Sequence, residues 1–200
     1  MGKNLDLKAL ERFFETLAGA TPEPVDILLI GGSAALLMGG TRATYDIDFE
    51  VTPKNPKADL EAFFHKTREI TDRTGIGVQF GTSVERWSEL TLLDYTQHKR
   101  PFKRYGTLAV YVLEPPYWAI GKVARYWDQD IQDMISVFSH EKTDPENLAG
   151  VWQRVLKESQ PSTVLFNLKK QMRHFFKTHG PKIWGKALML EKILPLFESA

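Results

Sequence analysis

The chain has 200 residues, of which 42% are hydrophobic and 26% charged, and it contains no cysteine. This composition is typical of a soluble globular protein of one domain with an appended helical region. The lack of cysteine excludes disulfides, thiolate nucleophiles and Cys-ligated zinc. The net charge is +1, but residues 151–200 hold nine Lys/Arg against three Glu, and the remaining residues sum to −5. Such a basic tail suits an anionic partner such as RNA, or is simply a solvated helical face.

The sequence offers no membrane-targeting or zinc-binding pattern. The polar N-terminus shows no signal-peptide apolar region, and no apolar run is long enough to span a bilayer. The five histidines lack the spacing of a zinc site. We therefore expect a cytoplasmic protein with no membrane partner.

The first half of the chain alternates helices and strands. Apolar spacing predicts a helix over residues 5–18, and the run Ile27–Ile30 predicts a buried strand. After Gly31-Gly32, Ser33 is expected to cap a short helix that ends at Met38. The alternation over Tyr45–Val51 predicts a strand. The later expected elements are a helix over 59–73, strands near 77–80, 87–94 and 107–113, and a basic loop at 97–104.

Everything after Pro116 is expected to be helical, over 117–127, 129–138, 145–157, 162–178 and 182–197. This order predicts an α+β fold in which a mixed sheet is flanked by helices. We expect a core over residues 1–138 and a C-terminal helical region over 139–200, packed on that core.

A glycine turn follows the predicted buried strand. Gly31 and Gly32 allow backbone N–H groups to approach an anion closely. The next helix would point its N-terminus at the same place, and Ser33 adds a hydroxyl donor. The turn predicts a phosphate-binding cradle, although Gly-Gly-Ser also occurs in many ordinary loops.

Two carboxylates stand on the following strand. Asp46 and Asp48 are two residues apart, so both side chains leave the same face, as does Glu50. The Asp pair is costly without a cation between the carboxylates, and Mg²⁺ (or Mn²⁺) suits such oxygen ligands. Arg42 can neutralise further phosphate charge. The pair alone could be a solvated strand face, but behind a phosphate cradle it indicates phosphoryl transfer.

These residues also resemble a known family. Gly32-Ser33, twelve residues and then Asp46-Ile47-Asp48 resemble the signature of the polymerase-beta-like nucleotidyltransferase superfamily. A second block, from Pro116 to Asp133, is similar to a segment of a minimal branch that includes abortive-infection (AbiEii-type) toxin nucleotidyltransferases. The resemblance covers about residues 25–138.

The resemblance implies a mixed-sheet nucleotidyltransferase fold and a role for each matching position. Gly32 and Ser33 would hold the triphosphate, Asp46 and Asp48 the metal, and Lys122 the nucleotide phosphates, while Asp130 or Asp133 would complete the site. On one continuous helix, Lys122 and Asp133 would share a face, and a break near Trp127 would change that. All three residues of this second block could also be ordinary exposed helix charges.

The superfamily often places a third carboxylate on a neighbouring strand, where it acts as a base. Glu89 and Asp94 flank a strand-like segment here, but neither has a convincing context, and Asp133 is a further candidate. Without a third carboxylate, the base must come from the helix aspartates, Lys122 or the acceptor.

We therefore predict a metal-dependent transferase that moves an NMP from an NTP to a tRNA, a protein or a small molecule. The resemblance adds a toxin role and a cognate antitoxin as partner. The alternatives are a catalytically silent nucleotidyltransferase-like regulatory protein and a nucleic-acid-binding protein with an incidental Asp-x-Asp strand.

Overall fold

A computed structural model describes residues 5–57, 60–82, 90 and 94–197 of the chain. These residues fall into two compact units. The first comprises Met1–Leu37, Thr41–Val84 and Lys99–Leu113, and the second comprises Met38–Gly40, Glu85–His98 and Glu114–Ala200. The expected core ends at residue 138, whereas the helices from Glu114 onward group with the C-terminal helices.

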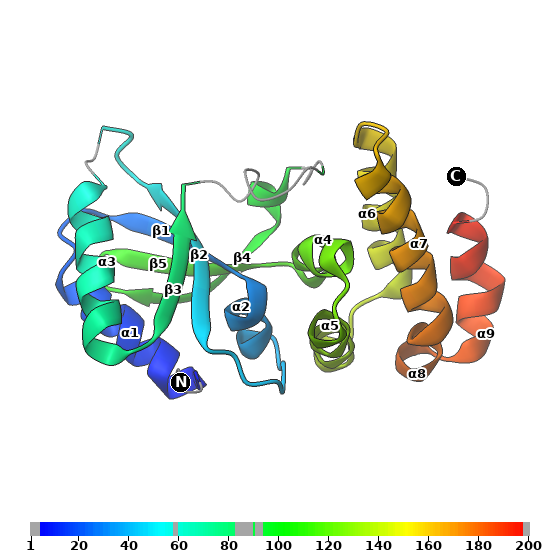
Figure 1. The fold of residues 1–200 in the computed structure, drawn as a ribbon, viewed down its shortest axis with the longest axis horizontal. Coiled ribbons are helices and arrows are strands. Elements are labelled where there is room, and N and C mark those ends of the chain that lie inside the picture. Colours follow the sequence, from blue (N-terminus) through cyan, green and yellow to red (C-terminus); the bar gives the residue numbers. More distant parts are fainter. Residues whose placement is uncertain (1–4, 58–59, 83–89, 91–93, 198–200) are drawn as a thin grey trace. The chain divides into compact units, whose positions relative to one another are not determined.

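A five-stranded mixed sheet forms the first unit (Figure 1). Its strand order is β3-β2-β1-β5-β4. β1 pairs antiparallel with β2 and parallel with β5, β2 pairs parallel with β3, and β4 pairs antiparallel with β5. The bounds are β1 Val25–Ile30, β2 Asp46–Pro53, β3 Gly77–Gly81, β4 Lys99–Tyr105 and β5 Leu108–Leu113. The predicted α+β fold with a mixed sheet is confirmed.

Two helices cover one face of this sheet through an aromatic cluster. They are α1 (Leu7–Gly19) and α3 (Glu61–Thr74). The rings of Phe14 and Phe63 pack edge-on against Phe49 of β2, with centroids 6.2 and 6.4 Å away. Because side chains alternate along a strand, the apolar Phe49 face leaves Asp46, Asp48 and Glu50 on the opposite face. The core thus fixes which way these carboxylates point.

The expected basic loop at 97–104 is wrong over most of its length. Residues Lys99–Tyr105 form β4, with a register shift between Pro101 and Lys103. β4 lies at the edge of the sheet and pairs only with β5. Edge strands tolerate charges and proline because one side of their backbone needs no partner strand. The strand expected at 87–94 lies largely outside the described residues.

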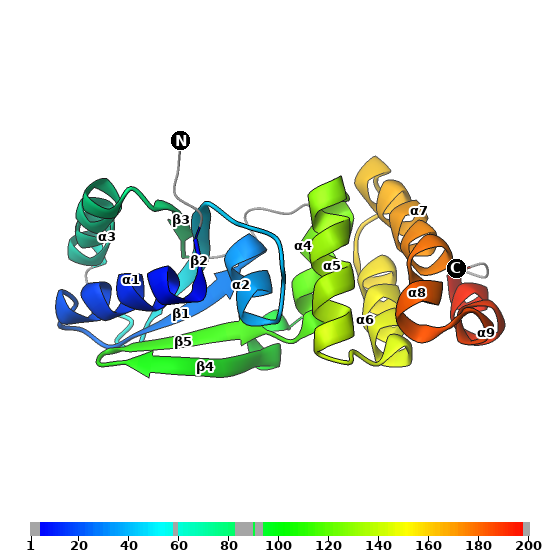
Figure 2. The same cartoon turned by 90° about the horizontal axis from the view of Figure 1, so that it is seen from below.

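The second unit is helical (Figure 2). Its core is built around aromatic rings. Trp152 and Phe176 lie 5.2 Å apart, and Phe138 packs edge-on against Phe175 at 5.8 Å. Among the described residues, no helix is both long and apolar enough to cross a bilayer. The helices are α4 Pro115–Arg125, α5 Asp128–His140, α6 Pro145–Glu158, α7 Thr163–Thr178, α8 Gly180–Trp184 and α9 Lys186–Leu188, with short turns η2 Tyr95–His98, η3 Met189–Ile193 and η4 Leu194–Phe197.

The single helix expected over 182–197 is wrong. The segment consists of α8, α9, η3 and η4, and Gly185 separates the first two with a φ of 94°. A residue with this φ cannot continue a right-handed helix. The sequence analysis treated Gly185 as an ordinary helix position.

Candidate functional site

The carboxylate of Asp48 lies directly over the glycine turn that ends β1. Gly31 has a φ of 61°, and a Cβ placed on it would overlap Asp48 Oδ2 and stand only 3.0 Å from Asp48 Cγ. Glycine is required here twice, because the backbone is left-handed and because no side chain fits. The turn and the strand carboxylate are thus parts of one constellation.

Ser33 is fully buried, and its hydroxyl bonds to the backbone of the turn and of β2. Its Oγ donates to the carbonyl of Ile30 at 3.0 Å and accepts from the N–H of Asp48 at 3.3 Å. The expectation that Ser33 caps the helix is wrong, because α2 (Gly31–Leu37) already begins at Gly31. Ser33 instead ties the start of α2 to the strand position of Asp48.

Residues 42–46 complete this constellation. Thr44 Oγ1 bonds to Asp46 Oδ1 at 3.2 Å, which orients the first carboxylate. An ideal Cβ on Gly32 would lie 2.8 Å from Thr44 Oγ1 and 3.1 Å from a terminal nitrogen of Arg42. The Arg42 guanidinium therefore lies beside the glycine turn. Within the first unit, the structure brings together the six predicted residues Gly31, Gly32, Ser33, Arg42, Asp46 and Asp48.

No third carboxylate faces Asp48 from the adjacent strands. Its register partners are Ile30 on β1 and Gln79 on β3. Among the described residues, no group of three His, Cys, Asp or Glu is close enough to hold a metal ion. Glu89 lies outside the described residues. Asp94 is exposed just before η2 in the second unit, so it gains no support as a metal ligand.

The second predicted block forms a buried ion-pair network in the second unit. Lys122 Nζ lies 2.6 Å from Asp133 Oδ2 and 3.1 Å from Asp130 Oδ1. Arg125 donates two hydrogen bonds to the carboxylate of Asp130, at 2.7 and 2.6 Å. Lys122, Asp130 and Asp133 are all at least 97% buried. Two cations and two carboxylates thus neutralise one another.

The pKa of Asp130 reflects this network. Burial alone would raise it, since an isolated buried carboxylate favours the neutral form. The hydrogen bonds from Arg125 and the charge of Lys122 outweigh burial, so the pKa of Asp130 lies below its usual value. Asp130 is therefore ionised at neutral pH and committed to its two cations.

The predicted helix break near Trp127 is confirmed. α4 ends at Arg125, Tyr126 adopts the left-handed conformation with a φ of 57°, and α5 begins at Asp128. The corner brings Asp130 and Asp133 on α5 to Lys122 on α4. Arg125 was not among the predicted site residues, although it precedes Asp130 by only five residues in the sequence.

Comparison with protein families decides the family. Residues 6–178 match the model of a family described as nucleotidyltransferase of unknown function (DUF6036). The chain belongs to this family. The match includes the glycine turn, Asp46, Asp48 and the Lys122 network. No curated protein and no solved structure matches the chain.

Membership of this nucleotidyltransferase family supports NTP as substrate and a transferase reaction. The narrower resemblance to abortive-infection toxins is tested by none of the comparisons and stays a prediction. Two residues that were not among the predicted site residues lie beside them. Glu50 is 95% buried on the Asp46–Asp48 face of β2, and Gln79 stands beside Asp48. Strand alternation had already placed Glu50 on that face.

Proposed function

We propose that the chain transfers a nucleoside monophosphate from an NTP to an acceptor hydroxyl, with release of pyrophosphate and with a divalent metal at Asp46 and Asp48. One observation carries this proposal. The Asp48 carboxylate and the Gly31-Gly32 turn are in direct contact, so a phosphate on the turn would lie next to a metal-binding carboxylate.

The residues present fit a magnesium or manganese ion. Asp46 and Asp48 offer oxygen ligands from one strand face, and Thr44 holds the first of them in place. Two protein carboxylates suffice for Mg²⁺, which usually keeps waters and takes phosphate oxygens as further ligands. When bound, the metal would neutralise charge on the oxygens of the reacting phosphate.

The surrounding residues would bind and orient the triphosphate. The glycine turn would bring backbone N–H groups close to the phosphates, because Gly31 and Gly32 carry no side chains, and Arg42 lies beside the turn. The acceptor oxygen attacks the α-phosphorus, a P–O bond forms, and the bond to the bridging oxygen breaks as pyrophosphate leaves. Binding of the phosphates at the turn would favour an arrangement in which the attacking oxygen and the leaving pyrophosphate lie in line on opposite sides of the phosphorus.

Glu50 is our candidate for the base that takes the proton from the acceptor hydroxyl. It follows Asp48 by two residues on the same strand face, and its neighbour on β3 is Gly81, which carries no side chain. Glu89 lies outside the described residues, and Asp94 is exposed just before η2. Lys122, Asp130 and Asp133 were predicted at the nucleotide. Their mutual ion pairs favour a role in positioning α4 and α5.

The test is a labelling assay. Wild type and the double variant Asp46→Ala/Asp48→Ala are incubated with each α-labelled NTP, Mg²⁺ or Mn²⁺, total tRNA and cell lysate. We expect transfer by wild type alone, abolished by EDTA, with label on RNA, protein or a small molecule. Asp72→Ala, an exposed aspartate on α3, is the matched control and should retain transfer.

A second candidate is a catalytically silent nucleotide-binding protein. Gln79 beside Asp48 favours it, because a neutral amide brings no negative charge to a metal site and cannot act as a general base. It predicts magnesium-dependent NTP binding, seen as a thermal shift, without transfer to any acceptor. Absence of both binding and transfer would contradict the transferase and the silent form together. A toxin role would appear as growth arrest on expression that requires Asp46 and Asp48.

A further inference from the structure

The exposed face of α7 carries a stripe of basic side chains. α7 contains four Lys/Arg and no Asp or Glu. Its buried side faces the aromatic core, while Lys170, Arg173 and Lys177 recur at helical spacing on the exposed side, together with Phe166. From Phe166 to Lys177 this stripe extends about 16 Å along the helix. Its charge is complementary to a row of phosphates.

Phe166 is an exposed aromatic ring at one end of this stripe. It is 59% exposed, and Lys170 Nζ lies 4.2 Å from the ring centroid. Phe166 also lines an open groove of about 750 Å³ between α6 and α7. Leu156 and Leu165 give its lining an apolar part, and the cations Arg154, Lys157 and Lys169 line it as well. An apolar hollow edged by cations suits a flat base attached to a phosphate.

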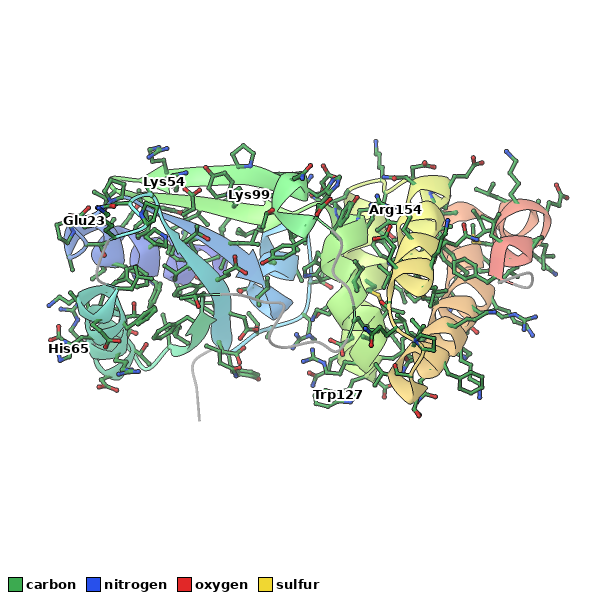
Figure 3. The ribbon with its side chains drawn as sticks, turned by 90° about the horizontal axis from the view of Figure 1, so that it is seen from above. Glu23, Lys54, His65, Lys99, Trp127 and Arg154 are labelled. Atoms are coloured by element: carbon green, nitrogen blue, oxygen red, sulfur yellow. The ribbon has the colours of Figure 1, made fainter. Side chains whose placement is uncertain are left out.

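Trp127 is a second exposed ring, held by a rigid turn. It is 63% exposed, although large aromatic side chains are usually well buried. The Arg125 guanidinium lies 4.7 Å from the indole centroid and is itself fixed by Asp130. Tyr126, which precedes it, adopts the left-handed conformation that non-glycine residues rarely take. In Figure 3 the Trp127 side chain points away from the helices.

The Trp127 turn is anchored to α7. The Tyr126 hydroxyl bonds to His174 Nδ1 at 2.7 Å, and burial raises the pKa of Tyr126 to about 12, so the phenol stays protonated. His174 lies on the exposed side of α7 between Arg173 and Lys177. The Trp127 turn is therefore joined through His174 to the exposed side of α7, which carries the basic stripe.

We propose that the exposed face of α7, its groove with α6 and the Trp127 turn bind single-stranded nucleic acid. Exposed bases stack on aromatic side chains while a cationic surface follows the phosphates. An acidic protein segment would be held by the same charges, but a protein interface buries its aromatic anchors among apolar neighbours. Trp127 is instead followed by the exposed polar residues Asp128 and Gln129. Within the proposed function this surface would hold an RNA acceptor.

The test measures binding without magnesium or NTP, so that it is separate from transfer. Fluorescence anisotropy is recorded for labelled oligo(U) and oligo(dT) of twelve nucleotides, and for a hairpin duplex. We expect wild type to bind the single strands more tightly than the duplex. Trp127→Ala and Phe166→Ala should each weaken binding roughly 5- to 100-fold, whereas Trp127→Phe, which keeps a stacking ring, should recover most of it.

Charge reversal tests the phosphate contacts. Lys170→Glu/Arg173→Glu should weaken binding and lower the slope of log K against log salt by about 1.4. The control Lys8→Glu/Arg68→Glu makes the same change in net charge at exposed positions of α1 and α3 and should leave the slope unchanged. Leu190→Ala removes an exposed apolar side chain outside this surface and controls for Phe166→Ala.

Three outcomes would overturn the proposal. They are equal affinity for duplex and single strand, indifference to both aromatic substitutions, and equal binding of a polyglutamate peptide, which would indicate an acidic protein partner. Circular dichroism of each variant is recorded to check that it is folded. The variant Asp46→Ala/Asp48→Ala should bind the oligonucleotides as wild type does, so failure of transfer and failure of this surface remain distinguishable.

Discussion

Gly31 makes the position of the Asp48 carboxylate depend on a single missing methyl group. Gly31→Ala would force the left-handed backbone on a residue with a side chain and push Asp48 away from the turn. A displacement of about 1 Å in a reactive group can cost roughly a hundredfold in rate. We expect Gly31→Ala to lose at least this much transfer activity, and magnesium-dependent NTP binding as well, measured by the labelling assay and by thermal shift.

Gly75→Ala is the matched control for this prediction. Gly75 also has a positive φ, of 70°, but a Cβ there would meet no atom within 4 Å. Both variants should lose about 1–2 kcal/mol of stability from backbone strain. Equal activity losses in the two variants would mean that general destabilisation, rather than the Asp48 contact, explains the effect.

Glu50 and Asp48 should separate base catalysis from metal binding. We expect Glu50→Gln to lower kcat by about 10²- to 10⁴-fold, the usual contribution of a general base, while magnesium-dependent NTP binding persists. The variant Asp48→Asn should lose both the transfer activity and the magnesium-dependent NTP binding. A Glu50→Gln variant with normal kcat would assign the proton transfer to another group.

At the scale of elements, the corner between α4 and α5 depends on the charge of Asp130. Asp130→Asn leaves Lys122 and Arg125 without this buried counter-charge, and breaking such a pair costs about 3–5 kcal/mol. We expect the free energy of unfolding to fall by roughly this amount at neutral pH, measured by urea denaturation.

The ion pairs of Asp130 also make the stability of the protein depend on pH. Because the folded pKa of Asp130 is depressed, its contribution is fully present above the unfolded value of about 3.9 and is lost as the pH falls through the folded value. The difference in the free energy of unfolding between wild type and Asp130→Asn should therefore be constant from pH 7 to about 5. It should become smaller below pH 4. A gap that widens in acid would contradict the ion-pair account.

The elements show what the sequence could and could not predict. Period-2 alternation placed Asp46 and Asp48 on one face of β2, and apolar spacing found α1 and α7, since both patterns follow from burial on one side. β4 was wrongly predicted to be a loop. It is an edge strand with few buried side chains, so its sequence shows no clear alternation of apolar and polar residues. The contacts of Ser33 and Lys122 join segments that are separated in the sequence. The spacing of neighbouring residues therefore could not predict them.

At the scale of the whole molecule, the two units should differ in their ability to fold alone. Residues 114–200 are contiguous and contain the aromatic core of the second unit, including Trp152, Phe175 and Phe176. We expect this fragment to be helical and to unfold cooperatively, measured by circular dichroism and tryptophan fluorescence. It lacks His98, which stacks on Tyr117 at 3.8 Å, so its stability should be lower than that of the unit in the full chain.

The fragment 1–98, which lacks residues 99–113, should not fold alone. It would lose β4 and β5, and β1 would become a bare edge of Val, Ile and Leu side chains. Long apolar edges aggregate. A soluble, folded fragment 1–98 would contradict the strand order β3-β2-β1-β5-β4.

The interleaving of the two units along the chain sets an order of events during synthesis on the ribosome. β1 and the carboxylates of β2 emerge early, but the parallel partner of β1 is β5, which ends at Leu113. Until β5 has left the exit tunnel, the incomplete sheet exposes the apolar edge of β1, to which a neighbouring chain can bind. We therefore expect the nascent protein to need chaperones until the sheet is complete, whereas the helices after Pro115 can form as soon as they appear.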